Sequence, residues 1–427
     1  FIFIGGLLQN LYLIIDSIIL GHYVGESGIA IVGVANPINF IVMGFLIGSA
    51  YGFGVIMARS FGAGDFKEFR KYFFNSIILS IIIGIVFTIV LSLVNSYLLE
   101  LISTPAELFN GAHKFLFILY IGCASSLIYN LFAATLRSIG NSFTPVLFLL
   151  LSVVINAILA YVFVAIFGWG VEGSAVATII AQSASALCCY VYINRKYPQI
   201  RLTKQDAVLD ISHMKNLILQ GAPMGMQFSF TGIGLIVVQK FLNGFGTNYI
   251  AGYSIVSYVY VALGTAISTF ISQNIGAKRM YRIPKAVKYT TLITIGCAIF
   301  STIVIRFFGP NFISLFTTAP NEELTHATVT YFNNVTLAYI PLGLIILYRS
   351  ALQGYGFPIT AMMAGIIELI NRVVIVIFLT DTFGFLAICL ADSVNWVITA
   401  AFLLTVYFIA TRSHKNKNKA FYIEPSM

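Results

Sequence analysis

Asp16 is the residue whose position most strongly suggests chemistry, because it is a single carboxylate within the apolar run LYLIIDSIILG. A charge near the middle of a bilayer costs at least about 2.5–3.5 kcal/mol, so such an acid usually faces a bundle interior or a wet cavity and takes part in ion or proton movement. Tyr12 lies one helical turn before Asp16 and Gln9 two turns before it, and Asn10 precedes Ser17 by the same seven residues. We therefore expect a polar face with Asp16 as an ion-coupling group; a merely structural buried acid is the alternative.

Polar residues in the second half of the chain suggest a cleft for a substrate. Glu368 and Arg372 are four residues apart with the acid first, an order that favours an ion pair within one helix, so a structural pair and a transport role both stay open. Asp392 could line the same cavity, and tyrosine rings suit either contact with a flat organic cation or packing. The candidate cleft residues are Gln9, Asn10, Gln227, Thr231, Tyr258, Tyr339, Glu368, Arg372 and Asp392.

Motifs for enzymes, cofactors and resident metals are missing from the sequence. The five cysteines all lie in apolar runs without CxxC spacing, which predicts neither a metal site nor a disulfide framework. An intramembrane protease or transferase would need a constellation such as HExxH or Ser/His at membrane depth, and ATP as direct energy source would need a Walker motif. We therefore expect a protein that is not an enzyme and has no cofactor.

The composition is that of a membrane protein with many spans. Hydrophobic residues make up 59% of the 427 positions and charged residues 9%, against a charged share of roughly 25% in soluble proteins. The net charge of +9 arises from basic residues in short loops, where they determine topology. Nucleic-acid binding is therefore not expected.

Twelve apolar runs are long enough to cross about 30 Å of hydrocarbon. The basic loops all follow even-numbered runs, which predicts that both termini are cytoplasmic in a multi-pass cell-membrane protein. The expected spans are 1–21, 28–58, 72–99, 112–136, 143–167, 171–194, 215–243, 249–274, 287–309, 327–353, 359–381 and 384–411. In the second span Gly44, Gly48 and Gly52 repeat every four residues, which predicts close approach of a neighbouring helix. Because the chain starts at Phe1 inside an apolar run, we expect a preceding segment in the natural protein.

The two halves of the chain repeat each other. RSFGAGDFKEFRK at 59–71 aligns with QNIGAKRMYRIPK at 273–285, and RSIGNS at 137–142 with QGYGFP at 353–358. An even number of spans in each half makes the repeats parallel, with a binding site expected at their interface. The expected fold is an all-α membrane protein of two parallel six-helix lobes around a central cleft. Its parts are an N-terminal lobe at 1–194, a linker at 195–214, a C-terminal lobe at 215–411 and a tail at 412–427.

These motifs resemble the multidrug and toxic compound extrusion (MATE) family of prokaryotic type. The resemblance rests on IIDSIILGHYVG, VANPI, GAGD, LRSIGNSFTP, GAP and QNIGAKR, and it covers essentially the whole chain. It implies an antiporter with alternating access that exports amphipathic, mostly cationic organic compounds in exchange for protons or sodium ions. It also implies a monomer in a bacterial cell membrane.

Carried over residue by residue, the resemblance places the coupling carboxylate on Asp16 with Tyr12 beside it. Asn156 keeps the family position in the fifth span, Ala160 replaces the usual second acid, and Thr178 supplies the hydroxyl of the sixth span. A lone carboxylate favours proton coupling, because a hard cation such as sodium prefers several oxygen ligands. Asn156 and Thr178 could equally be interhelical contacts, and Thr231 stands where some relatives have an acid.

A second function from the same superfamily stays open. A flippase or exporter of a lipid-linked or amphiphilic metabolite would share the fold, but such relatives usually carry extra spans and more cations in the cavity. This chain has twelve expected spans, and Arg372 is the intramembrane cation that the sequence analysis identifies. Export of organic cations is therefore the favoured interpretation.

Overall fold

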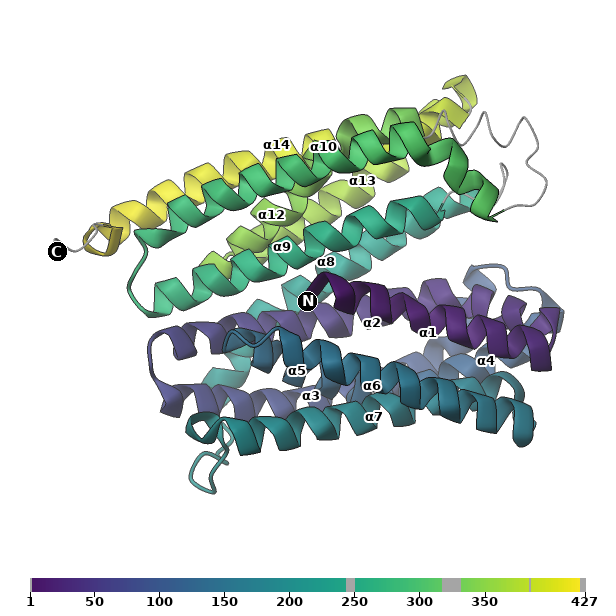
Figure 1. The fold of residues 1–427 in the computed structure, drawn as a ribbon, viewed down its shortest axis with the longest axis horizontal. Helices are drawn as coiled ribbons and strands as arrows, with labels where there is room; N and C mark the ends of the chain where they lie inside the picture. The colour runs from purple at the N-terminus through teal and green to yellow at the C-terminus, as the bar shows by residue number, and fades with distance from the viewer. Residues whose placement is uncertain (1, 243–249, 317–331, 384, 423–427) are drawn as a thin grey trace. The chain divides into compact units, whose positions relative to one another are not determined.

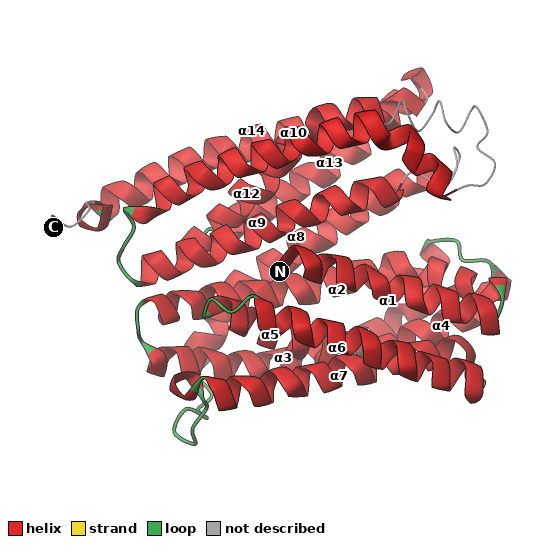
Figure 2. Ribbon diagram, viewed as in Figure 1, coloured by secondary structure: helices red, strands yellow, loops and turns green. Residues whose placement is uncertain are grey.

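The computed structural model describes residues 2–242, 250–316, 332–383 and 385–422, and within them it consists of helices and loops without strands (Figure 2). Thirteen α-helices are described. The helices up to residue 242 are α1 (Ile2–Tyr23), α2 (Glu26–Gly62), α3 (Phe66–Leu101), α4 (Ala106–Ile121), α5 (Cys123–Ser138), α6 (Phe143–Ala160), α7 (Gly170–Lys196) and α8 (Ile211–Leu242) (Figure 1). The later helices are α9 (Ile250–Gly276), α10 (Arg282–Phe316), α12 (Tyr339–Tyr355), α13 (Pro358–Phe383) and α14 (Phe385–Lys417).

Within the described residues, each of the twelve expected spans overlaps one of these helices or a broken pair, which confirms the fold class. Eight described helical segments are long and apolar enough to cross a membrane, or nine when the bent pair α4–α5 counts as one span. Long apolar side chains on α3 stay exposed, such as Leu93 at 80% and Ile89 at 56%. Such a surface is stable against lipid rather than water.

The fourth span is broken, which the sequence analysis did not predict. α4 and α5 meet at Gly122 with a bend of 48°. A Cβ at Gly122 would lie 2.5 Å from Cγ1 of Ile179 on α7. Glycine therefore permits the close approach of α7 at the bend.

The chain forms two compact units, Phe1–Ser229 and Phe230–Met427. The boundary lies inside α8, whereas the sequence analysis placed a linker at 195–214. In the first unit the early part of α8 packs on α2 through glycines of both helices. A Cβ at Gly52 would lie 2.5 Å from Cα of Gly221, and one at Gly225 would lie 2.6 Å from the carbonyl oxygen of Phe45. The glycine face predicted on α2 is therefore a close helix contact.

Replacing Gly52 by Ala should destabilise the first unit by about 1–3 kcal/mol, because backbone atoms of α8 occupy the space of the new methyl group. Gly33 on the same helix is the matched control, since a Cβ there meets nothing within 4 Å. Alanine normally improves a helix interior by about 0.5–1 kcal/mol over glycine. Thermal unfolding of the purified variants in detergent measures both effects, and equal stability of the two variants would contradict the packing argument.

The expected linker is held against the start of α3 in the first unit. Nε of Arg70 donates to Oδ2 of Asp206 at 2.8 Å, and Nδ2 of Asn75 donates to the carbonyl oxygen of Val208 at 3.1 Å. The imidazole of His213 lies 2.9 Å from Oε1 of Glu68. This segment is therefore part of the first unit.

Candidate functional site

Asp16 lies on α1, where α6 and α7 pack against that helix. The side chain is 8% exposed, and its Oδ1 atom makes no hydrogen bond with the protein. The Tyr12 ring on α1 and the Ser174 hydroxyl on α7 are close enough to interact electrostatically with the carboxylate. The predicted polar face of the first helix therefore meets polar groups of the same unit.

Asn156 and Thr178 connect α6 to α7, and the contact extends to Ser174. Nδ2 of Asn156 donates to Oγ1 of Thr178 at 3.1 Å, and that hydroxyl donates to the carbonyl oxygen of Ser174 at 3.1 Å. Oδ1 of Asn156 is buried and makes no hydrogen bond with the protein, and the Ser174 hydroxyl is a hydrogen-bonding neighbour of the Asp16 carboxylate. The sequence-predicted residues are thus brought together on three helices.

Two serines of this cluster were missed by the sequence analysis. The Tyr12 hydroxyl donates to Oγ of Ser152 on α6, and Ser174 is the neighbour of Asp16 described above. Ser152 precedes Asn156 by four residues, and Ser174 precedes Thr178 by four residues. That spacing places each serine on the same helix face as the neighbouring predicted residue. Helical periodicity could therefore have identified both serines from the sequence.

The cluster offers two buried oxygens without a hydrogen bond from the protein, Oδ1 of Asp16 and Oδ1 of Asn156, together with the Ser174 hydroxyl beside the carboxylate. Buried polar atoms are usually hydrogen-bonded, so an exception of this kind requires an explanation. Oxygen atoms arranged around one carboxylate can accept a proton or coordinate a hard cation. Among the described residues, no group of three or more His, Cys, Asp or Glu could hold a metal ion.

The position of the absent second acid is at the end of α6. Ala160 is fully buried one turn after Asn156, and the chain then continues as a π-helical turn at Tyr161–Ile166. π-turns are rare and often lie at functional sites, because they widen a helix locally. Because residues four apart lie on the same helix face, a longer side chain at 160 would begin close to the Asn156 carboxamide.

A second polar cluster is buried inside the second unit, and it contains two ion pairs between helices. Nη2 of Arg349 on α12 donates to Oε1 of Glu368 on α13 at 2.5 Å. Nε of Arg372 on α13 donates to Oδ1 of Asp392 on α14 at 3.0 Å. All four side chains are at most 9% exposed. Opposite charges compensate one another here, as burial in a low-dielectric environment requires.

The partners differ from the sequence prediction. The spacing of Glu368 and Arg372 favoured a pair within α13, but the ion pairs that the structure shows join them to Arg349 and Asp392 on neighbouring helices. Glu368 and Arg372 therefore link α13 to α12 and to α14, respectively. Arg349 was missed because it lies near the end of its apolar run, where basic residues usually mark a loop.

The other predicted cleft residues have varied surroundings. Oγ1 of Thr231 on α8 donates to Oε2 of Glu368 at 3.2 Å, which joins Thr231 to the second cluster. Tyr339 is buried in the apolar core with its ring 6.5 Å from that of Trp396. Gln227 is 4% exposed within the first unit. The side chains of Gln9, Asn10 and Tyr258 lie outside the part of the structure that is described.

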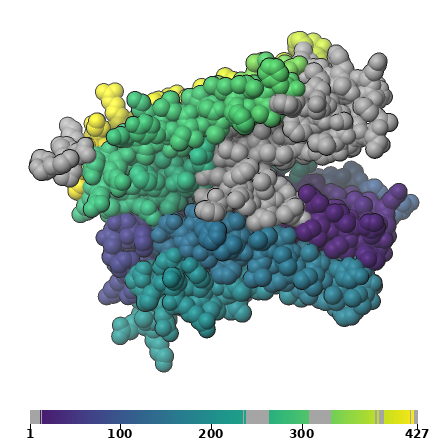
Figure 3. Space-filling view, viewed as in Figure 1, coloured from purple at the N-terminus to yellow at the C-terminus, as the bar shows by residue number. Residues whose placement is uncertain are grey.

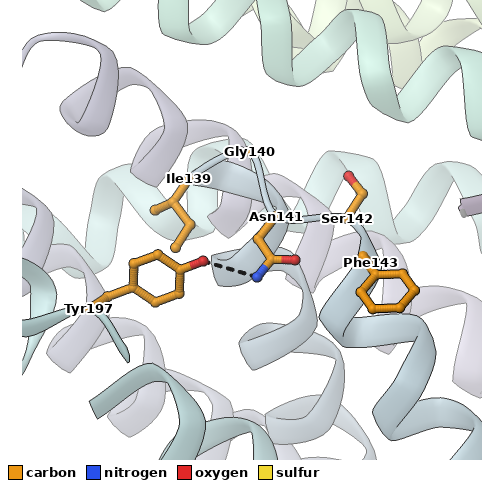
Figure 4. Close-up of a pocket in the computed structure, with 6 residues that line it drawn as sticks. All are labelled: Ile139, Gly140, Asn141, Ser142, Phe143 and Tyr197. Carbon is orange, nitrogen blue, oxygen red and sulfur yellow. Dashed lines mark hydrogen bonds between the residues drawn. The ribbon is translucent and has the colours of Figure 1, made fainter. Parts of the chain in front are cut away.

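A surface hollow lies in the first unit. It has a volume of about 440 Å³ and is lined by the turn Ile139–Phe143 and by Tyr197 (Figure 4). Nδ2 of Asn141 donates to the Tyr197 hydroxyl at 2.9 Å, and the Asn141 carboxamide also bonds with Thr144 at the start of α6. The polar groups of this hollow are therefore satisfied by one another, and we assign it no chemistry.

Comparison with known proteins identifies membrane transporters as similar proteins. The family model described as MatE matches residues 2–162 and 223–378. A Bacillus subtilis (strain 168) protein named YpnP, described as a probable multidrug resistance protein, is 26% identical over 333 residues, which cover 75% of this chain and 73% of the relative. An FAD transporter of Shewanella oneidensis is 22% identical over 364 residues, covering 81% of this chain and 78% of the relative. The structure of a MOP superfamily transporter from Pyrococcus furiosus has the same fold, with TM-score 0.86, 19% identity and coverage of 98% of this chain and 94% of that one.

Proposed function

The chain belongs to the MatE family of membrane transporters, and on that premise we propose that it is a secondary antiporter that exports amphipathic organic cations in exchange for protons or sodium ions. Members of this family are transporters and not enzymes. The proposed cycle is alternating access, in which Asp16 binds the coupling ion. The relative described as a probable multidrug resistance protein supports this class of substrate.

The observation that carries the proposal is a set of three buried oxygens, from Asp16, Asn156 and Ser174. They come from α1, α6 and α7, and the Oδ1 atoms of Asp16 and Asn156 make no hydrogen bond with the protein. An unsatisfied buried carboxylate is unfavourable unless a proton or a cation compensates its charge. An ion that binds and leaves in each cycle would supply that compensation alternately, which is what coupling requires.

The proposed coupling ion is the proton. Sodium prefers several oxygen ligands, and Ala160 removes the second acid that would raise the negative charge of the site. Protonation of one carboxylate needs no additional ligand. Sodium coupling is the competing proposal, with Asn156 and Ser174 as neutral donors.

Vesicle transport with imposed gradients separates the two ions. We expect a fluorescent organic cation to move in response to a proton gradient at constant sodium concentration. Wild-type transport driven by a sodium gradient at fixed pH, and indifferent to a proton gradient, would contradict proton coupling. Absence of transport of every tested organic cation under both gradients would contradict the proposed substrate class.

The Ala160→Asp variant should increase the dependence of transport on sodium or shift its pH optimum, because it places a second carboxylate one turn from Asn156. The Ala160→Asn variant has nearly the same size without the charge, and we expect its ion dependence to remain that of the wild type. Both variants are assayed in the same vesicles under each gradient. If Asp and Asn alter ion dependence equally, the effect is steric and the charge argument is wrong.

A second candidate function is export of an amphiphilic metabolite with anionic groups. The similarity to an FAD transporter supports it, and an anionic group of the substrate would have to replace Glu368 or Asp392 as the partner of Arg349 or Arg372. Guanidinium groups bind carboxylate and phosphate well. Inhibition of organic-cation transport by an excess of a flavin nucleotide would favour this candidate, and lack of inhibition would favour the cation exporter.

The proposed setting is a bacterial cell membrane, with the protein as a monomer and both termini in the cytoplasm. The orientation follows from basic residues that gather on the even-numbered loops. The proposed lobes are the repeats of the sequence analysis, at 1–194 and 215–411.

A further inference from the structure

One end of the second unit is strongly basic. We call it the basic rim, and it consists of exposed lysines and arginines at the α9–α10 turn, on the first turns of α10 and at the end of α14. Its described members are Lys278, Arg279, Arg282, Lys285, Lys288, Arg412, Lys415 and Lys417. Segments 276–290 and 405–422 contain no aspartate or glutamate. None of these cations forms an ion pair with any residue that the structure describes.

The chain after α14 folds back and joins the two parts of the basic rim. The amide nitrogen of Tyr281 donates to the carbonyl oxygen of Phe421 at 3.1 Å. Nζ of Lys278 lies 5.6 Å from the centre of the Phe421 ring, a cation–π contact. The end of α14 (yellow) accordingly borders the start of α10 (green) on the surface (Figure 3). The cations of both segments therefore act on one region.

The basic rim begins where the lipid-facing apolar surface ends. On α14, Phe408 and Ile409 are 62% and 66% exposed, and Arg412 follows within one turn. On α10, Leu292 is 56% exposed, and Lys288 precedes it by one turn. Apolar side chains of this exposure lie in hydrocarbon, so the cations that follow them lie at the level of lipid headgroups.

The corresponding end of the first unit is different, because acids are interspersed with its cations. Arg70 pairs with Asp206 at 2.8 Å, and Glu68 lies 2.9 Å from the imidazole of His213. Burial would raise the pKa of Asp206, but hydrogen bonds from Thr203 and Arg70 outweigh it and hold the pKa below the usual range. Asp206 is therefore ionised at neutral pH and neutralises a neighbouring cation.

We infer that the basic rim of the second unit is a binding surface for the headgroups of anionic phospholipids. In the described segments 276–290 and 405–422, eight exposed cations without an acid create a positive potential, and each lysine or arginine near an anionic membrane strengthens attachment by about fivefold. Cation–π contacts of Lys278 with Phe421 and of Arg282 with Phe270 hold two of these cations in place. Binding of lipid headgroups at the basic rim does not depend on which compound or ion is transported.

The test compares two triple variants of the full chain. Arg279→Gln/Lys285→Gln/Lys288→Gln removes three exposed cations from the basic rim. Lys196→Gln/Arg201→Gln/Lys204→Gln removes three exposed cations from the first unit, and it is the matched control. Native mass spectrometry of the purified proteins, titrated with phosphatidylglycerol or phosphatidylcholine, gives apparent affinities for each lipid.

We expect the wild type to prefer phosphatidylglycerol over phosphatidylcholine by at least about tenfold, and the rim variant to lose that preference while the control keeps it. Equal losses in the two variants, or no preference in the wild type, would overturn the inference. Displacement of phosphatidylglycerol by an equal concentration of inorganic phosphate would also overturn it, because the surface would then bind free phosphate. Thermal unfolding of both variants checks that they are folded.

Discussion

Asp16→Asn is expected to reduce gradient-driven efflux to the background rate of empty vesicles while the protein stays folded and inserted. Asparagine has the shape of aspartate but neither takes up a proton nor carries the charge that holds a cation. The substitution also removes the cost of burying a carboxylate charge, since the Asp16 side chain is 8% exposed, so folding should not suffer. The measurement is uptake of a fluorescent organic cation into vesicles under an imposed proton or sodium gradient, with thermal unfolding as the check on folding.

Glu172→Gln is the matched control for this prediction. Glu172 lies on α7, the helix that carries Ser174, but its side chain is 43% exposed and lies 3.0 Å from Nζ of Lys114. Exposed pairs contribute at most about 1 kcal/mol, so transport by this variant should be that of the wild type. Efflux at the wild-type rate by a folded Asp16→Asn protein would remove Asp16 from the coupling site.

The second large effect is expected from Asp392→Asn, which takes the ionic partner from Arg372. Arg372 is 1% exposed, and breaking a buried pair by removing one partner costs about 3–5 kcal/mol. We expect a clearly lower midpoint of thermal unfolding in detergent. The double variant Arg372→Met/Asp392→Leu removes both charges, so it should recover most of the stability.

The same pair of variants separates a structural role from a role in transport. If the double variant is stable and transports normally, the Arg372–Asp392 pair serves to join α13 to α14. A stable double variant that has lost transport would place the pair in the transport mechanism. Lys114→Met breaks an exposed ion pair and serves as control, with an expected change below about 1 kcal/mol. Equal stability of Asp392→Asn and wild type would contradict the argument from burial.

The sequence by itself determined the class of protein, the positions of the spans and one face of several helices. Apolar runs of membrane length dictate helices, because a bilayer leaves backbone groups no other partner. A lone acid in such a run identified Asp16, and the four-residue repeat of Gly44, Gly48 and Gly52 identified a close helix contact. These inferences need only local spacing and the cost of charge in lipid.

Only the tertiary structure decided which groups meet. Helical spacing shows which residues share a face but not which neighbouring helix covers that face. Spacing within α13 favoured a Glu368–Arg372 pair, yet the packing of α12 and α14 supplied Arg349 and Asp392 as partners. Ser174 became a neighbour of Asp16 in the same way, since 158 residues separate them in the chain and only the packing of α7 on α1 brings them together. Partner choice across helices is a property of packing, which no single helix encodes.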